Sequence, residues 1–380
     1  DAELQLERAR NQSALRQMRS DPVALAEEQL WSAAFGDRRY GRSPFGSDSA
    51  LARLTRDDLR VFHRDHYRPD HALLVVAGDV NPDTVFALAT EWFGRWSGRA
   101  IATRAAEPPA ARERVRIVDV PDASYSVVRL GIVVPGLRDD ASLPLSLAAS
   151  RFSGGAFSWL QQPAVRRRLG PLVSGGLTSY ADAGLFSFGT PVTTDSVGSV
   201  VRLLRDVLRQ YVSHSPARSE IETIRLAGQT GFLASLETLG GVIGSWSSMA
   251  LDGRSDDVLR RTDARLAGMN AAEIEGAGSR WLVADSVVIV AVGPARALEP
   301  QLSAFGRVRV VSLPSAPPPA PPDTAVVTET SVARAHEVIA AALIALPPLS
   351  RPVATVVAAS PEEVRDGVRL APTGRSVIQD

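Results

Sequence analysis

Hydrophobic and polar positions near the start of the chain follow helical spacing. Residues 4–19 are rich in residues that favour helices. A second helix is expected from Pro22, because Asp21 suits the capping position and Pro fits the first turn. Gly36 is placed to end that helix. The first 36 residues are therefore expected to form two consecutive helices.

The next segment combines a helix signal with a strand signal. Thr55 and Asp58 have capping-box spacing, and the helix they start should end before Pro69. Residues 71–77 (HALLVVA) form a short continuous apolar run, which predicts a buried strand. After a turn at Gly-Asp, Pro82 is expected to open another helix.

The middle of the chain predicts a mixture of strands and helices. Alternating or continuous apolar runs predict strands, and apolar positions spaced three and four apart predict helices. Strands are expected over residues 115–120, 125–134, 173–181, 185–192 and 286–292, and the third and fourth of these form a hairpin. Helices are expected over 142–152, 157–169, 196–212, 217–235, 239–251 and 256–267, and from Asn270 onward.

An internal repeat links two of these segments. Residues 54–59 align with residues 269–274, and the same shift of 215 places Asp70 on Asp285 and Gly78 on Gly293 without a gap. Both copies therefore have a helix cap, a helix, a buried strand and a Gly turn in the same order. The second unit starts near Arg114, so the first should start about a hundred residues ahead of Asp1. We expect the first unit to be incomplete in this chain.

Composition and charge exclude several classes of function and of functional site. The chain has 380 residues, 45% of them hydrophobic, which suits two or three globular domains. Its 42 basic and 42 acidic residues balance, so the charge indicates no nucleic-acid partner. Cysteine is absent, which excludes disulfides, thiolate metal sites and Cys nucleophiles. The longest apolar run has twelve residues, whereas a membrane-spanning helix needs roughly 20.

Two stretches resemble a known peptidase family. DPVALAEEQLWSAAFGDRRYGRSPFGS, followed by LTRDDLRVFHRDHYRPDHALLVVAGDV, is similar to the second half of the N-terminal domain of insulinase/pitrilysin-type zinc metallopeptidases. This family includes the processing-peptidase subunits and the cytochrome bc core proteins. FSGGAFSWLQQPAVRRRLGPLVSGG resembles a segment of the next homologous domain. The resemblance covers about residues 1–310.

The resemblance implies an α+β fold of tandem metallopeptidase-like domains, each with helices packed on a mostly antiparallel sheet. We expect residues 1–110 to be the C-terminal half of the first domain and residues 111–310 to be a complete second domain. Residues 311–323 are a Pro-rich linker. Residues 324–380 are expected to be a small α/β or partly disordered tail.

The family's zinc site is incomplete in this chain. Two His of an inverted His-x-x-Glu-His helix and a later Glu hold the zinc in active members, and the motif's Glu is the general base. None of the five His here has that motif, which would lie in the missing part of the first unit. The later Glu falls on Ser13 or Ala14, and neither binds zinc well. Glu7 lies two turns too early. We therefore expect no catalytic residue, no metal ligand and no cofactor.

The family's substrate contact is half preserved. Members hold the peptide backbone with an Arg and a Tyr, and these positions fall on Arg166 and Val173. Arg166 is therefore the one candidate substrate-binding residue. The alternative is that residues 166–168 form a solvated helix end favoured by the helix dipole.

Other candidate sites have simpler explanations. His63 and His66 are three residues apart, but they have no obvious third or fourth ligand. The Gly pairs at 154–155 and 240–241 fit no phosphate-loop pattern, and the chain has no Lys. Four tryptophans at helical positions are expected in the core, whereas exposed ones would indicate a partner face. They are Trp92, Trp96, Trp246 and Trp281.

These observations favour a non-catalytic subunit. The chain would pair with a zinc-bearing homologue as a heterodimer, or self-associate, and would supply half of a peptide-enclosing chamber. Two alternatives stay open: a structural core-type subunit of a larger assembly, and a fragment of an active zinc endopeptidase. Bacterial relatives that are exported suggest the periplasm or cell envelope, but the sequence leaves the compartment undetermined.

Overall fold

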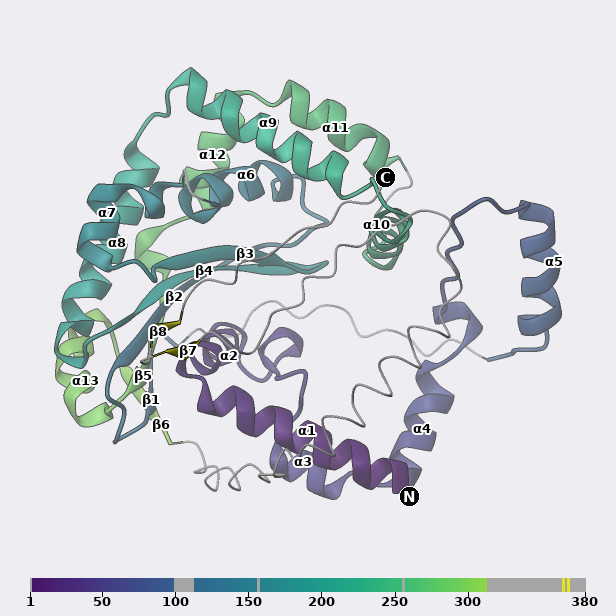
Figure 1. The fold of residues 1–380 in the computed structure, drawn as a ribbon, viewed down its shortest axis with the longest axis horizontal. Helices are drawn as coiled ribbons and strands as arrows, with labels where there is room; N and C mark the ends of the chain where they lie inside the picture. The colour runs from purple at the N-terminus through teal and green to yellow at the C-terminus, as the bar shows by residue number, and fades with distance from the viewer. Residues whose placement is uncertain are drawn as a thin grey trace. The chain divides into compact units, whose positions relative to one another are not determined.

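The computed structural model describes residues 2–98, 113–155, 158–254 and 257–312, together with residues 364–365 and 368–369 (Figure 1). The chain divides into two compact units, residues 1–316 and 317–380. In the second unit the described strands β7 (Val364–Arg365) and β8 (Val368–Arg369) pair antiparallel. Residues 99–112, most of the predicted linker and most of the tail lie outside the described residues. No helix in the described part is long and apolar enough to cross a membrane.

The two predicted N-terminal helices are present. α1 (Ala2–Ser20) precedes α2 (Pro22–Phe35). The Asp21 side chain accepts a hydrogen bond from the Val23 amide, and Gly36 ends α2 with a positive φ of 63°, a conformation that favours glycine. A short helix that the sequence analysis missed, α3 (Asp48–Arg53), follows and is capped by Ser47.

The next two helices also start where the sequence predicts. α4 (Arg56–His66) has the complete Thr55–Asp58 capping box, and α5 (Pro82–Phe93) is capped by Asn81. The predicted strand over 71–77 was wrong, because residues 72–77 form no strand and Leu73, Leu74 and Val76 are exposed. A strand needs neighbours to pair with, and none lies beside this run in the described structure.

A six-stranded sheet is the centre of the first unit. The strand order is β3-β4-β2-β5-β1-β6. The pairs β3–β4, β4–β2 and β2–β5 are antiparallel, whereas β5–β1 and β1–β6 are parallel. The mostly antiparallel sheet with packed helices confirms the predicted α+β class. The strands are β1 (Val115–Asp119), β2 (Ser126–Pro135), β3 (Ser174–Ser179), β4 (Ala183–Val192), β5 (Val288–Gly293) and β6 (Val308–Val311).

Helices cover one face of this sheet and form the larger core with it (Figure 1). Phe152, Phe186 and Phe188 are fully buried in this core. The helices of this part of the chain are α6 (Ser142–Ser153), α7 (Pro163–Leu169), α8 (Val197–Ser213), α9 (Arg218–Ala234), α10 (Leu239–Leu251), α11 (Val258–Gly268), α12 (Ala271–Trp281) and α13 (Ala295–Leu302).

Two differences from the sequence prediction concern local signals. The helix expected over 157–169 is a 3-10 turn at Trp159–Gln161 followed by α7, because Pro163 starts a new helix. The prediction also missed α13 and β6, whose short runs have little periodicity. Trp92 and Trp96 are 69% and 39% exposed, so their assignment to the core was wrong.

The opposite face of the sheet is covered by α2. Leu25, Leu30 and Phe35 of α2 are buried against Val127 and Val290 of the sheet. A Cβ on Gly131 of β2 would lie 2.9 Å from the Leu30 side chain, so the helix sits directly on the strand. A helix from the first predicted domain therefore completes the core of the second.

Candidate functional site

α1 displays the positions where the resemblance places the third zinc ligand. Ser13 is exposed, Ala14 is half-buried, and Leu15 is buried beside them. Glu7 is exposed and pairs with Arg10 at 2.5 Å. Within the described residues, no group of three or more His, Asp or Glu side chains lies together as a metal site would require. The residues present here therefore do not fit a zinc ion.

The two histidines of α4 make aromatic contacts instead. The His63 ring stacks on Tyr67 with ring centroids 4.9 Å apart, and His66 packs against Phe62 at 4.4 Å. Their two imidazoles lie near the C-terminal end of α4, where positive charge is favourable. These contacts account for both side chains without a ligand.

Arg166 and Val173 take different environments. Arg166 is exposed in the last turn of α7, and no hydrogen bond or ion pair of its side chain is present among the described residues. Val173 is buried at the start of β3, and its carbonyl accepts a hydrogen bond from Gln161 Nε2 at 3.1 Å. The Val side chain thus fills the core where the family has a donor, and Arg166 stands alone.

Arg116 joins the sheet to α2. This side chain is buried on β1, and its Nη1 donates to Oε1 of Gln29 on α2 at 3.1 Å. Its Nε donates to Glu113 at 2.7 Å, and Glu113 also accepts from Arg309 of β6. Burial by itself would raise the pKa of Glu113, but the hydrogen bonds from these two arginines outweigh it and lower that pKa. One carboxylate therefore links two strands and, through Arg116, α2.

Arg129 connects the same helix to the edge of the sheet. Its Nε lies 3.7 Å from Oε2 of Glu27 on α2, and its Nη1 donates to Ser174 Oγ on β3 at 3.2 Å. Gly189 of β4 lies between the two strands, opposite both Arg129 and Ser174. Because Gly189 has no side chain, Arg129 crosses β4 and holds the first residue of β3.

β3 is an open edge of the sheet. Within the described residues it pairs with β4 alone, and its sequence SGGLTS contains no charge and no proline. The other edge strand, β6, carries the exposed Arg309. Charges and prolines are the usual means of blocking an edge strand, and β3 has neither, so it is a candidate to pair with another extended segment.

A groove runs beside this edge. Its first part, of about 450 Å³, lies between β3 and α6 and is lined by Ser150, Gly154 and Gly176, among others. Its second part, of about 920 Å³, extends between α9, α10 and α11. The two parts share Leu137, Ser146 and Ser179. Small side chains thus border the edge strand in the first part, charged side chains such as Arg138 and Arg265 line the second, and Arg166 lines neither.

Sequence reasoning missed this groove. Its signal was the six-residue SGGLTS run, which lacks the charged or proline residues of a guarded edge. Gly154 ends α6, and its amide donates a hydrogen bond to the carbonyl of Ser150. Gly154 also lines the groove, which only the fold places beside β3.

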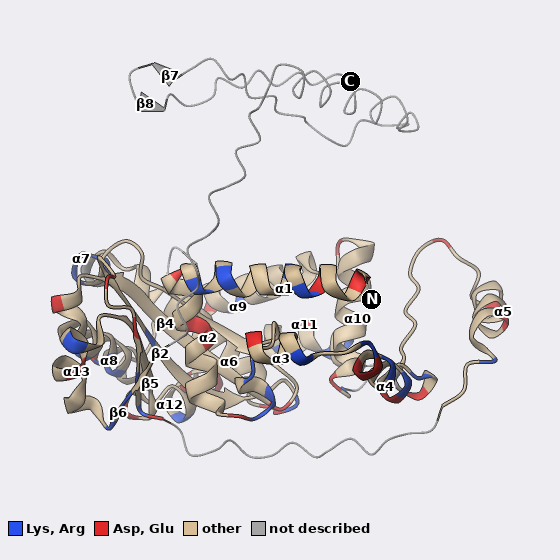
Figure 2. Ribbon diagram, turned by 90° about the horizontal axis from the view of Figure 1, so that it is seen from below, with Lys and Arg blue, Asp and Glu red and all other residues tan. Residues whose placement is uncertain are grey.

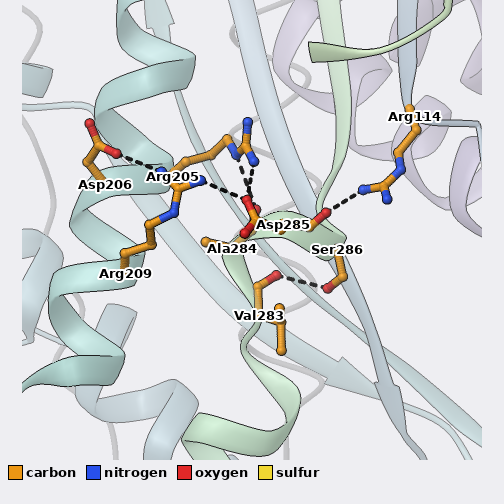
Figure 3. A network of polar contacts seen from close by, with 8 residues as sticks. All are labelled: Arg114, Arg205, Asp206, Arg209, Val283, Ala284, Asp285 and Ser286. Atoms are coloured by element: carbon orange, nitrogen blue, oxygen red, sulfur yellow. Dashed lines mark hydrogen bonds and ion pairs between the residues drawn. The ribbon is translucent and has the colours of Figure 1, made fainter.

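A network of charged side chains surrounds Asp285, just ahead of β5 (Figure 3). Asp285 accepts from Arg209 of α8 at 2.7 Å and also from Arg205, and its carbonyl accepts from Arg114 ahead of β1. Hydrogen bonds from Arg209 and then Arg205 lower the pKa of Asp285. Elsewhere the acidic residues of α1 lie toward its start and its basic residues follow (Figure 2). The network around Asp285 therefore links α8 and the segment ahead of β1 to the turn before β5.

The chain is similar to known proteins in sequence. Residues 53–227 match the family described as Peptidase M16 inactive domain. A Mycobacterium leprae protein named an uncharacterized zinc protease is 28% identical over 264 residues, which cover 67% of this chain and 57% of that protein. The zinc protease PqqE of Helicobacter pylori is 25% identical over 241 residues, which cover 60% of this chain and 53% of that protein.

Solved structures share the fold. The peptidase M16 inactive domain from Pseudomonas fluorescens matches with a TM-score of 0.69 at 20% identity, covering 77% of this chain and 71% of that chain. A Helicobacter pylori protease matches with a TM-score of 0.67 at 18% identity, covering 77% of this chain and 73% of that chain.

The sequence matches and the fold together show that this chain is similar to the insulinase-type, or M16, peptidases. The predicted family resemblance is confirmed. The chain spans just over half the length of the two relatives described above.

Proposed function

We propose that this chain is a non-catalytic subunit of an M16-type peptidase, which forms half of a peptide-enclosing chamber with a zinc-bearing homologue. The proposal rests on one observation: Ser13 and Ala14, which lie on α1, carry no carboxylate. The M16 fold is kept, but a hydroxyl and a methyl group stand where the third zinc ligand belongs. A hydroxyl on an exposed helix face is a poor substitute for a carboxylate in a zinc site.

The edge strand gives this subunit a means of holding peptide. An extended peptide that adds to β3 receives main-chain hydrogen bonds, and its alternate side chains point into the groove between β3 and α6. The part of the groove between β3 and α6 is lined by small residues such as Ser150, whereas charged residues such as Arg138 and Arg265 line the part between α9, α10 and α11. The chain would therefore position peptide, while the homologue would supply zinc, water and general base.

The first test is metal and activity analysis. The purified chain, loaded with zinc and then dialysed, should contain no stoichiometric zinc and cleave no peptide. Mixed with a zinc-bearing M16 homologue from the same source, it should restore cleavage of an unstructured peptide that saturates at an equimolar ratio. Stoichiometric zinc in this chain alone would refute the non-catalytic role. Stable association without any gain in cleavage would favour a structural core-type subunit instead.

The second test separates peptide holding from assembly. Ser150→Lys should fold normally, because Ser150 is exposed on α6, yet its longer side chain would obstruct the groove that Ser150 lines. Ser219→Lys on α9 is the matched control, since Ser219 is also exposed and does not line the groove. We expect the first variant to raise the KM of the mixed complex several-fold, and the second to leave it unchanged. Equal KM values for both variants would exclude β3 as the peptide site.

Arg166 is tested in the same complex. If its guanidinium holds a peptide carbonyl, Arg166→Ala should reduce cleavage while Arg167→Ala, on the same exposed helix end, should not. An equal, small effect of both substitutions would show that this helix end is only a solvated surface.

A further inference from the structure

The second part of the groove, between α9, α10 and α11, is rich in arginine. The arginines that line it are Arg138, Arg254, Arg261 and Arg265. Asp139 and Asp140 line it as well. Among the described residues, none that lines the first part, beside β3, is charged. The groove therefore changes from small and neutral to charged beyond Ser179, where β3 ends.

Arg138 and Arg254 meet at the C-terminal end of α10. Arg138 donates from Nε to the carbonyl oxygen of Asp252, and Nη2 of Arg254 lies 3.5 Å from Oδ2 of the same residue. Arg138 also donates from Nη1 to Asp182, between β3 and β4, at 2.7 Å. Both arginines line the groove, whereas Asp252 and Asp182 do not. These two arginines, which we call the arginine pair, therefore border the groove without the carboxylates that hold them.

The arginine pair has donors to spare. Nη2 of Arg138 makes no hydrogen bond within the described part of the chain. A Cβ added to Gly253, which lines the groove, would lie 3.4 Å from that nitrogen. Arg254 is held by the 3.5 Å ion pair with Asp252, and its buried Nε has no hydrogen-bond partner among the described residues. A buried donor without a partner is costly, so this guanidinium gains by turning toward an acceptor in the groove.

A peptide held along β3 leads to the arginine pair. Leu137, Ser146 and Ser179 line both parts of the groove, so the two parts join at the end of β3. An extended peptide paired with β3 therefore passes from the neutral part into the part that the arginines line. A carboxylate is the acceptor that suits them there, because hydrogen bonds from guanidinium to carboxylate are shorter and stronger than those between neutral groups.

We propose that the arginine pair is a site for a carboxylate of the bound peptide, from an acidic side chain or from a free C-terminus. The inference rests on the proposed function, since it takes the peptide to lie along β3. The carboxylate supplies the acceptor that the unused donors of the arginine pair lack. The chain therefore selects peptides with such a carboxylate over neutral ones.

The other charged residues of the groove are engaged elsewhere. Arg261 forms an ion pair at 2.7 Å within its own helical turn, and Arg265 pairs with Glu273. Asp139 accepts from a backbone amide just ahead of α6 at 2.8 Å, and the charge of Asp140 acts on Arg265. The arginine pair is therefore the part of the groove that offers free guanidinium donors.

Peptide binding to the purified chain tests the proposal without the zinc-bearing homologue. The reference is a neutral, amidated peptide of about ten residues, which is long enough to span the six residues of β3. It is compared with amidated peptides that carry one Glu at either end, and with the neutral peptide that has a free C-terminus. Fluorescence anisotropy of a neutral dye on each peptide gives the Kd. The peptide that gains affinity identifies the source of the carboxylate.

We expect one of these carboxylates to lower the Kd about tenfold at low salt, and salt to reduce the gain. Arg138→Gln and Arg254→Gln should each remove the gain. The Arg138 side chain is 51% exposed, so its replacement should leave the fold intact, as circular dichroism would check. Arg218→Gln is the matched control, because Arg218 is exposed on α9, pairs with Glu222 at 2.9 Å and does not line the groove.

Two results would overturn the carboxylate site alone. One is equal affinity for all the peptides, and the other is a gain that Arg218→Gln removes as fully as Arg254→Gln does. If Ser150→Lys still weakens binding of the neutral peptide in either case, peptide holding along β3 stands without the carboxylate site. Failure of every peptide to bind would contradict both the carboxylate site and the peptide-holding role.

Discussion

Arg129 reaches Ser174 across an intervening strand. The two residues belong to β2 and β3, their side chains meet at 3.2 Å, and Gly189 of β4 lies opposite both. The same guanidinium lies 3.7 Å from Glu27 of α2. Through Arg129, the open edge of the sheet is therefore linked to α2. The Arg129 side chain can cross β4 because Gly189 has no side chain in its way.

Gly189→Ala should destabilise the protein. A Cβ at this position would overlap the carbonyl oxygen of Val128 and lie 2.9 Å from Arg129 Cα, so backbone must move. We expect a loss of about 1–3 kcal/mol in the free energy of unfolding, measured by urea titration. Gly176→Ala, where a Cβ meets nothing, should change it by less than about 0.5 kcal/mol. Equal losses of stability in the two variants would show that Gly189 is not needed for Arg129 to cross β4.

Arg116→Met should weaken the attachment of α2. The substitution leaves Gln29 and Glu113 without their buried donor, which costs about 1–3 kcal/mol. Arg309→Met removes the other donor to Glu113, but its side chain is 64% exposed, so we expect a loss below about 1 kcal/mol. Thermal and urea unfolding would rank the two variants, and the reverse ranking would contradict the buried bridge.

Leu30→Ala should cost more than either arginine change. Leu30 is fully buried between α2 and β2, and its truncation leaves a cavity above Gly131. Such substitutions cost about 2–5 kcal/mol. Leu6→Ala on α1, where the leucine is 46% exposed, should stay within about 0.5 kcal/mol of the parent. Hydrogen exchange should show faster exchange in α2 in the first variant alone. Unchanged exchange there would argue against α2 as part of this core.

Glu113 should make stability depend on pH. Its pKa is lower in the folded protein than in the unfolded chain, so the unfolded chain binds more protons in the acid range. The stabilisation is therefore complete above the ordinary Glu pKa and is lost as the pH falls through the lowered value. Glu113→Gln should be less stable than the parent at neutral pH, and the difference should shrink on acidification. A difference that grows in acid would reverse the inferred sign.

Removing either of its two arginine partners should raise the pKa of Asp285, but by unequal amounts. Arg209 contributes most to lowering the pKa of Asp285, and Arg205 comes second. Arg209→Gln should therefore raise the carboxyl pKa toward its ordinary value by more than Arg205→Gln does. Carboxyl titration by NMR measures both shifts. A larger pKa shift for Arg205→Gln would contradict the prediction that Arg209 contributes most to the lowered pKa of Asp285.

The sequence by itself determined where most helices start and which family the chain resembles. Asp21, Thr55 and Asn270 start their helices as predicted, because capping depends on a few neighbouring side chains. The β3–β4 hairpin and the order of elements also followed from periodicity and turn residues. The sequence also shows that positions 13 and 14 carry no carboxylate, and the family resemblance predicts a zinc ligand there.

Tertiary structure decided everything that depends on a distant partner. The apolar run over 72–77 has the pattern of a buried strand, but its conformation depends on neighbours that the described chain does not place beside it, whereas the matching β5 has them. Trp92 is exposed for the same reason. The crossing of Arg129 over Gly189 and the groove beside β3 join residues that are 45 or more positions apart or on separate elements. No local pattern encodes such proximity, because pairing and packing are set by the whole fold.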